Sequence, residues 1–245
     1  MERLKLGMLV ILLTALPDPG RSSLEPSLED ILTAYFITDI QGSGQVQFRS
    51  EGSAGWERGR LGTRLEEGDR ILVGEGTQAV LSLKKGILVH LDGNSEMTIE
   101  TLREEAGNGF RTRLKLWTGD LLGDVGEPME KTGSSFEVGT EGVVCGAQGT
   151  VFEIASHGGT VETAVRAGRV HVQGGDFSRD CGPGQTCRAA HGRFQGLQRS
   201  LPQCARRFAA WERLGPPLRG LEPGQAPRVG AFLPLSGLGP TAPPR

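Results

Sequence analysis

The sequence lacks a hydrophobic run long enough to cross a membrane, and it lacks the common catalytic motifs. Its longest apolar stretch, residues 6–16, covers eleven residues, whereas a bilayer-spanning helix needs about 20. There is no G-x-S-x-G elbow, no H-E-x-x-H and no phosphate-binding glycine loop followed by lysine. We therefore predict that the chain is not an enzyme and that it needs no cofactor.

The first twenty residues have the pattern of an export signal. Arg3 and Lys5 precede the apolar stretch, and Pro-Asp-Pro-Gly at 17–20 ends it. A run of this length fits the apolar centre of a signal peptide. We predict a signal peptide over residues 1–20 and export to the periplasm or the extracellular space. An uncleaved inner-membrane anchor is the alternative, because no clean small-x-small cleavage triplet is present.

Export affects how the four cysteines are interpreted, because disulfides form in oxidising compartments. Cys181 and Cys187 flank a Gly-Pro-Gly turn that could bring them together, and Cys145 would then pair with Cys204. A zinc site built from Cys181, Cys187, His191 and Cys204 is the alternative. Its spacing lacks the close C-x2-4-C pair typical of such sites. We predict disulfides and no metal.

Glycine-rich turns separate short alternating segments throughout the middle of the chain. The 38 glycines disfavour helices and favour turns. Residues 110–116 alternate three apolar residues with three cations, the pattern of a half-buried antiparallel strand. We expect an all-β domain over residues 40–190, an antiparallel, rolled or β-solenoid-like sheet of short strands. The 51- and 49-residue spacings between Gly68, Gly119 and Gly168 are the reason to consider a solenoid.

Two short helices and a tail are expected around this domain. In the lead-in, residues 21–39, apolar residues recur at helical spacing: Leu28, Ile31, Leu32, Tyr35 and Phe36. Residues 191–214 have the pattern of a short basic helix that docks on the β domain. Residues 215–245 are rich in proline and glycine, which predicts a disordered tail.

Charge divides unevenly along the chain. Residues 22–187 carry 15 Lys and Arg against 25 Asp and Glu, a net charge of −10, whereas residues 188–245 carry nine arginines and two glutamates, a net charge of +7. The arginine-rich tail either lies back on the acidic body or contacts an anionic partner, such as a membrane surface or a cell-wall polymer. The overall charge of −2 gives no reason to expect nucleic acid.

One aromatic side chain is a candidate for ligand contact. Trp117 falls on the outward phase of the strand that begins near Phe110, where its ring could stack on a sugar. The aspartates beside glycines, such as Asp69 and Asp92, favour turn roles, because aspartate side chains bond nearby backbone groups.

Five segments taken in order resemble one known family. They are Glu-Gly-Asp-Arg-Ile at 67–71, a Lys-Gly turn at 85–86, Leu-Trp-Thr-Gly-Asp-Leu-Leu at 116–122, Gly-Thr-Val-Phe at 149–152 and Val-Arg-Ala-Gly-Arg-Val at 165–170. Together they resemble the FecR domain, the periplasmic part of bacterial iron-signalling proteins. The resemblance implies the role that this domain has in the signalling members of the family. There it senses an outer-membrane siderophore transporter and relays the state of the transporter to a sigma factor.

The chain differs from the signalling members of that family at its N-terminus. Only five residues precede the apolar stretch, so we expect a standalone exported member that lacks the cytoplasmic anti-sigma segment. Near Cys145, Ala147-Gln148 also replaces the Val-Arg that often precedes Gly-Thr in the family. The resemblance implies a non-enzymatic periplasmic protein-binding module, sensory or adaptor, with an envelope protein such as an outer-membrane transporter as partner. A carbohydrate- or cell-wall-binding structural module, using Trp117 and the arginine-rich tail, is the alternative.

Overall fold

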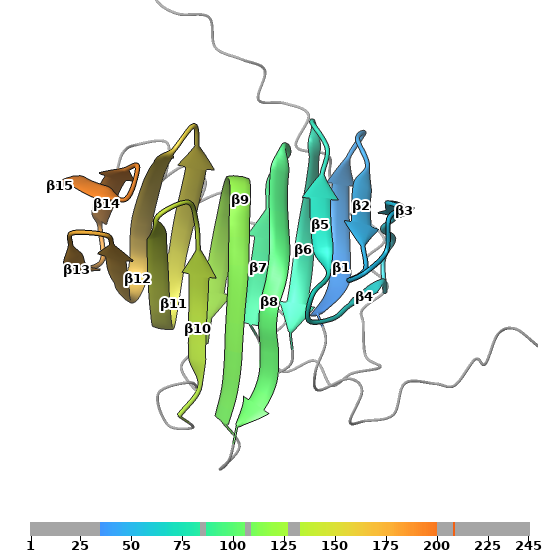
Figure 1. Cartoon of the computed structure of the whole chain (residues 1–245), viewed down its shortest axis with the longest axis horizontal. Coiled ribbons are helices and arrows are strands. Elements are labelled where there is room, and N and C mark those ends of the chain that lie inside the picture. Colours follow the sequence, from blue (N-terminus) through green and yellow to red (C-terminus); the bar gives the residue numbers. More distant parts are fainter. Residues whose placement is uncertain (1–34, 84–86, 106–108, 127–132, 200–207, 209–245) are drawn as a thin grey trace, which may run out of the picture.

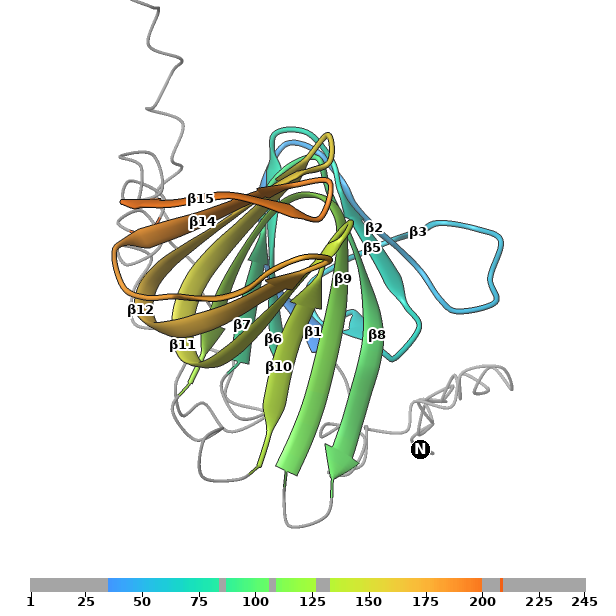
Figure 2. The ribbon, with the colours of Figure 1, turned by 60° about the vertical axis from the view of Figure 1, so that its left-hand side comes forward.

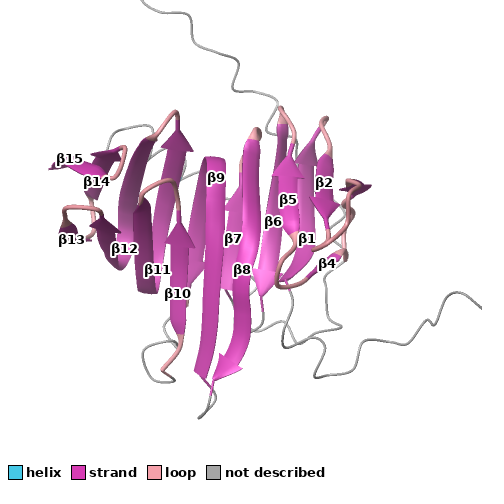
Figure 3. Cartoon of the chain, viewed as in Figure 1, coloured by secondary structure: helices cyan, strands magenta, loops and turns pink. Residues whose placement is uncertain are grey.

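Fifteen β-strands form a single sheet in the part of the chain that the structure describes, residues 35–83, 87–105, 109–126, 133–199 and 208 of a computed structural model (Figures 1 and 3). The strands are β1 (Tyr35–Gly42), β2 (Val46–Arg49), β3 (Glu57–Arg58), β4 (Arg64–Leu65), β5 (Arg70–Val73), β6 (Thr77–Leu83), β7 (Ile87–Leu91), β8 (Ser95–Glu105), β9 (Gly109–Val125), β10 (Ser135–Gly139), β11 (Val143–His157), β12 (Thr160–Gly174), β13 (Ser178–Cys181), β14 (Gln185–Ala190) and β15 (Arg193–Arg199). The all-β prediction is confirmed.

Three long strands hold the sheet together by changing neighbours along their length. The first half of β9 pairs with β8 and β10, and its second half pairs with β7 and β11. Strands β11 and β12 divide in the same way. Figure 2 shows the result, a sheet that curves around its interior with β14 and β15 at one end. The strand pairs are antiparallel except β9–β10, which is parallel. Of the arrangements predicted from the sequence, this curved and mainly antiparallel sheet fits the rolled sheet (Figure 2).

The glycine motifs lie where these long strands bend. Gly119 in β9 has a φ of 99° and Gly168 in β12 has a φ of 76°, both in the left-handed region that disfavours other residues. The pairing of β11 with β12 shifts register between Gln148 and Val151. Strands that pass from one layer of a β-structure to another do so at bends and bulges. The motifs at 116–122, 149–152 and 165–170 are therefore the corners of the roll.

The motif at 67–71 fixes the turn before β5. The carboxylate of Asp69 accepts hydrogen bonds from the backbone N–H of Glu66 at 2.9 Å and of Glu51 at 3.3 Å. Glu67 accepts from the backbone of Leu102 at 2.9 Å and binds the guanidinium of Arg103, which holds the pKa of its carboxyl below the ordinary value. Both acids thus tie the turn to neighbouring segments, and the turn role predicted for Asp69 is confirmed.

The interior of the roll is one continuous apolar core. Each strand contributes alternate side chains, as in the inward Leu114 and Leu116 of β9, which are fully buried. Phe136 and Phe152 meet edge to face with ring centroids 6.1 Å apart. Burying one large aliphatic or aromatic side chain contributes about 1.5–3 kcal/mol to stability. A core of many such side chains therefore holds the strands, and the residues on their outer face, in fixed positions.

The structure shows strands in parts of both segments for which a helix was predicted. Residues 35–39 belong to β1, where Tyr35 and Ile37 point into the core, so the lead-in helix predicted for 21–39 is wrong over this part. Residues 193–199 form β15 rather than the start of a basic helix. The signal peptide, the Lys85-Gly86 turn and the tail at 215–245 lie outside the described residues.

Candidate binding surface around Trp117

A β-bulge presents Trp117 on the outer face of the sheet. In the β8–β9 ladder Met97 pairs with Leu116 and Glu96 pairs with Thr118, which leaves Trp117 as one extra residue on β9. Bulges of this kind re-aim a side chain and increase the local twist. The side chain of Trp117 is 50% exposed, so the prediction that it faces outward is confirmed. Whether it contacts a ligand stays a prediction.

Neighbouring side chains hold the indole of Trp117 in place. Its N–H donates a hydrogen bond of 2.9 Å to the hydroxyl of Thr98 on β8. The guanidinium of Arg70 lies 4.9 Å from the ring centroid, and the ammonium group of Lys115 lies 5.4 Å from it. Cations at such distances from an aromatic face contribute about 0.5–1 kcal/mol at exposed sites. The ring is therefore an exposed platform with a fixed orientation.

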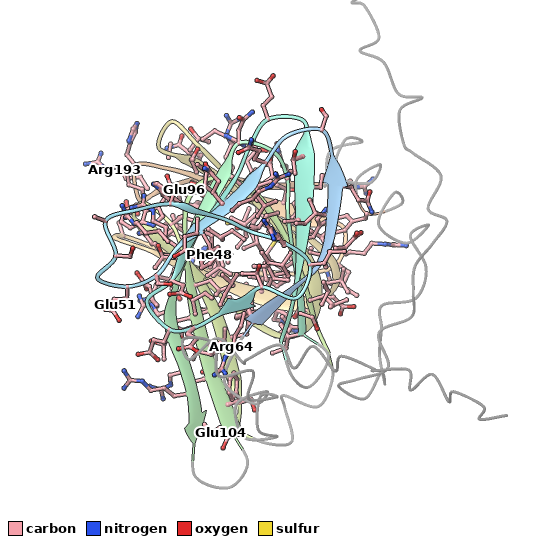
Figure 4. All side chains as sticks on the ribbon, turned by 90° about the vertical axis from the view of Figure 1, so that its right-hand side faces the viewer. Phe48, Glu51, Arg64, Glu96, Glu104 and Arg193 are labelled. Carbon is pink, nitrogen blue, oxygen red and sulfur yellow. The ribbon has the colours of Figure 1, made fainter. Side chains whose placement is uncertain are left out.

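The two cations beside Trp117 are themselves anchored. Arg70 forms an ion pair with Glu96 at 2.7 Å, and Lys115 donates to the backbone carbonyl of Thr140 at 2.6 Å. Figure 4 shows the side chains from the end of the molecule that carries β2 and β3 and labels Glu96, the partner of Arg70. The surface thus combines an aromatic plane with fixed positive charges.

Three of the four cysteines gather around Thr163 of β12. The thiol of Cys145 lies 3.2 Å from the Thr163 hydroxyl, that of Cys181 lies 3.5 Å from the Thr163 carbonyl, and Cys187 pairs with Thr163 in the β12–β14 ladder. All three are buried free thiols, and burial raises the pKa of Cys145 to about 12 and that of Cys181 to about 11. Cys181 and Cys187 are not joined, so the structure does not show the disulfide predicted between them. Cys204 lies outside the described residues, so the pairing of Cys145 with Cys204 stays a prediction.

A second polar arrangement joins residues that the sequence analysis did not connect. On the β12–β13 hairpin, Asp180 Oδ1 lies 2.8 Å from His171 Nδ1, and Ser178 Oγ lies 2.9 Å from His171 Nε2. The order serine, histidine, aspartate is that of a nucleophile, its base and an orienting acid. The imidazole and the carboxylate are each 52% exposed, however, and Asp180 also pairs with Arg169 at 3.5 Å. Water and Arg169 therefore compete for the groups that such chemistry would need.

Two carboxylates are buried on the outer face of the sheet. Glu153 pairs with Leu122 and Ala164 in the ladders on either side of β11, and it is 3% exposed; Asp124 is 1% exposed. The side chain of Phe208 packs against Leu122 and Ala164 at this place. A residue of the C-terminal segment thus docks on the β domain at this position, as expected for residues 191–214.

Two further properties concern the described residues as a whole. No cluster of three or more His, Cys, Asp or Glu side chains there could hold a metal ion. None of their helices has the length and the apolar character needed to span a bilayer.

This rolled, all-β domain with fixed surface side chains matches a known family. Residues 69–171 match the family model described as FecR protein, and four of the five segments that resemble the family lie wholly within that range. The match assigns residues 69–171 of the chain to a FecR domain. A comparison with curated proteins found no match.

Two solved structures are similar to the chain. Both are crystal structures of a protein from Parabacteroides distasonis that is provisionally assigned as an anti-sigma factor. One has 19% sequence identity, covers 58% of this chain and 64% of the other, and has a TM-score of 0.47. The second has 17% identity, covers 58% and 63%, and has a TM-score of 0.48. The chain thus spans less than two thirds of the length of these proteins.

Proposed function

We propose that this chain is an exported, non-enzymatic FecR-domain protein of the cell envelope, where it binds a protein partner as a sensory or adaptor module. The FecR match over residues 69–171 is the observation that carries the proposal. The continuous apolar core supports it, because a stiff sheet presents surface residues in fixed positions and so loses little entropy on binding. An outer-membrane transporter is the partner that the family resemblance implies.

A carbohydrate- or cell-wall-binding structural module is the second candidate. Trp117 favours it, because a half-exposed indole held by Thr98 is a suitable platform for a sugar ring. The arginine-rich C-terminal part would add attraction to anionic polymers or to a membrane surface.

The experiment that separates the two is crosslinking in the native envelope. The full chain would carry an affinity handle and would be compared with a variant that lacks residues 215–245. A truncation at residue 188 would cut through β14 and is unsuitable. Recovery of one dominant envelope protein, especially an outer-membrane transporter, supports the sensory or adaptor role.

Two other outcomes contradict that role. Recovery of envelope polymer alone, lost in Trp117→Ala, would favour the structural module instead. Recovery of neither protein nor polymer from intact envelopes would overturn both candidates.

A further inference from the structure

Cationic side chains form a row across four neighbouring strands on the outer face that carries Trp117. In the ladders Arg49 of β2 pairs with Arg70 of β5, Arg70 pairs with Thr98 of β8, and Thr98 pairs with Lys115 of β9. Neighbouring strands lie about 4.8 Å apart, so the row extends over roughly 14 Å. It is long enough to contact several units of a chain molecule.

An aromatic ring accompanies the cations at each end of this row. The guanidinium of Arg49 lies 5.1 Å from the ring centroid of Trp56. Arg70 and Lys115 lie beside Trp117 at the other end. We call these five side chains the cation–aromatic row: Arg49, Trp56, Arg70, Lys115 and Trp117.

The row is unfavourable for folding in one respect. Arg49 and Arg70 stand directly opposite each other, and like charges in that position destabilise a sheet. The two arginines lie within residues 22–187, a region with a net charge of −10. Most charged residues of this region are therefore acidic. Local arrangements that oppose stability are concentrated at functional sites. The ion pair of Arg70 with Glu96 at 2.7 Å offsets part of this repulsion, and we take the remaining like-charge arrangement as support for a role in binding.

We propose that the cation–aromatic row binds an acidic polysaccharide, a chain of sugar rings that bear carboxylates. Guanidinium and ammonium groups form charge-assisted hydrogen bonds with carboxylates, and exposed indole surface stacks on apolar faces of rings. A neutral glycan would leave the cations unused, and an acidic peptide would make little use of the two tryptophans. The proposal rests on the second candidate function above, the carbohydrate- or cell-wall-binding module, and names a ligand class for it.

Three side chains of the row are already held in position before a ligand binds. The Trp117 indole is tied to Thr98, Lys115 to the carbonyl of Thr140, and Arg70 to Glu96. Long side chains that are already held lose less entropy when a ligand orders them. Because Arg70 keeps Glu96 as its partner, Arg49 and Lys115 are the cations best placed to meet a ligand carboxylate.

The test is a binding titration of the full chain with three polymers. Alginate supplies carboxylates on sugar rings, dextran supplies neutral rings, and polyglutamate supplies carboxylates without rings. We expect saturable binding to alginate, at least about tenfold weaker binding to polyglutamate, and none to dextran. Raising the salt from about 0.05 M to about 0.5 M should weaken alginate binding, because salt screens exposed charges.

Matched variants separate a site from a general charge effect. Arg49→Gln/Lys115→Gln and the control Arg193→Gln/Arg199→Gln each remove two positive charges, but the control does so on the distant strand β15. The first should weaken alginate binding about tenfold or more, and the control should leave it within about twofold. Trp117→Ala should also weaken alginate binding. The melting temperature of this variant should stay above the temperature of the titration, so that the variant remains folded.

Several results would overturn the proposal. Equal losses in the two double variants, or equal binding of alginate and polyglutamate, would reduce the interaction to ion exchange. Binding of polyglutamate in preference to alginate would make an acidic protein segment the occupant. If alginate does not bind while envelope crosslinking of Arg49→Gln/Lys115→Gln still captures its protein partner, the ligand class is wrong and the proposed function stands.

Discussion

Gly168 of β12 lies against the carbonyl oxygen of Gly149 in β11, and the space between them leaves no room for a side chain. A Cβ on Gly168 would stand 2.5 Å from that oxygen and 2.9 Å from the Cα of Thr150. The Thr150 hydroxyl donates to the Arg169 carbonyl at 3.0 Å across the same corner. The segments at 149–152 and 165–170 therefore meet at one bend of the roll, which gives a physical reason for glycine at position 168.

Replacing Gly168 by alanine should destabilise the domain much more than the same change at Gly184. Both glycines have left-handed φ angles, 76° and 74°, but a Cβ at Gly184 would meet nothing within 4 Å. The left-handed backbone alone costs about 1–2 kcal/mol, and forced overlap adds about 1–3 kcal/mol. Denaturant unfolding should show the larger loss for Gly168→Ala. Equal losses in the two variants would mean that the corner relaxes and that the close approach carries no energy.

Phe208→Ala should lower the free energy of unfolding by about 3–5 kcal/mol, the range for truncation of a buried phenylalanine. Phe208 is 3% exposed and packs on Leu122 and Ala164, so its loss exposes apolar surface on the sheet. Leu61→Ala is the control, because Leu61 is 65% exposed and its truncation should change stability by less than about 0.5 kcal/mol. Thermal and urea unfolding measure both. Similar small effects for the two variants would show that Phe208 contributes little to stability.

The strand pattern could be predicted from sequence where one face is buried and the other is polar. Residues 110–116 alternate in the structure as they do in the sequence, and the same alternation placed Trp117 outward. The bulge at Trp117 could not be predicted, because it depends on the register of β8 against β9 and not on β9 alone. The cation–aromatic row was missed for the same reason, since its members come from separate strands.

The lead-in helix shows how a short apolar pattern misleads. Tyr35 and Phe36 extend a helical stripe from Leu28, but Tyr35 and Ile37 also alternate as a strand does. Over so few residues the two periods overlap, and pairing with β6 and β4 decides in favour of the strand. The contact of Phe208 with Leu122 joins positions far apart in sequence, so its sheet partner could not be inferred from local pattern.

Stability of the reduced protein should fall above about pH 9, and Cys145 should account for part of the loss. Burial raises the pKa of Cys145 from 9.0 to about 12. The folded state therefore keeps a proton that the unfolded state releases, and stability declines as pH rises from 9 toward 12. Burial likewise raises the pKa of Tyr35, which adds to the decline at the upper end.

The measurement compares the wild-type protein with Cys145→Ala by urea unfolding at several pH values under reducing conditions. One pKa unit corresponds to about 1.4 kcal/mol, so the alkaline loss should be smaller in the variant by about 4 kcal/mol near pH 12. Below pH 9 the two proteins should differ by a constant amount. Parallel curves over the whole range would show that the Cys145 thiol does not titrate with unfolding.

The hairpin that carries Ser178, His171 and Asp180 should have no hydrolytic activity of its own, as the proposed binding function implies. All three groups lie on an exposed surface, and Arg169 shares the Asp180 carboxylate at 3.5 Å. A catalytic serine needs a base held away from competing partners and donors aimed at the developing oxyanion. Hydrolysis of p-nitrophenyl acetate should therefore be the same for the wild-type protein, for Ser178→Ala and for Asp180→Asn.

His171→Gln is the sharper comparison, because an exposed imidazole hydrolyses activated esters weakly without help from its neighbours. A fall in rate limited to His171→Gln would identify that background reaction and agree with the expectation. A loss of about tenfold or more in Ser178→Ala, with burst release of nitrophenol in the wild-type protein, would contradict it. Such a result would establish an acyl-enzyme on β13 and require the chain to be treated as an enzyme.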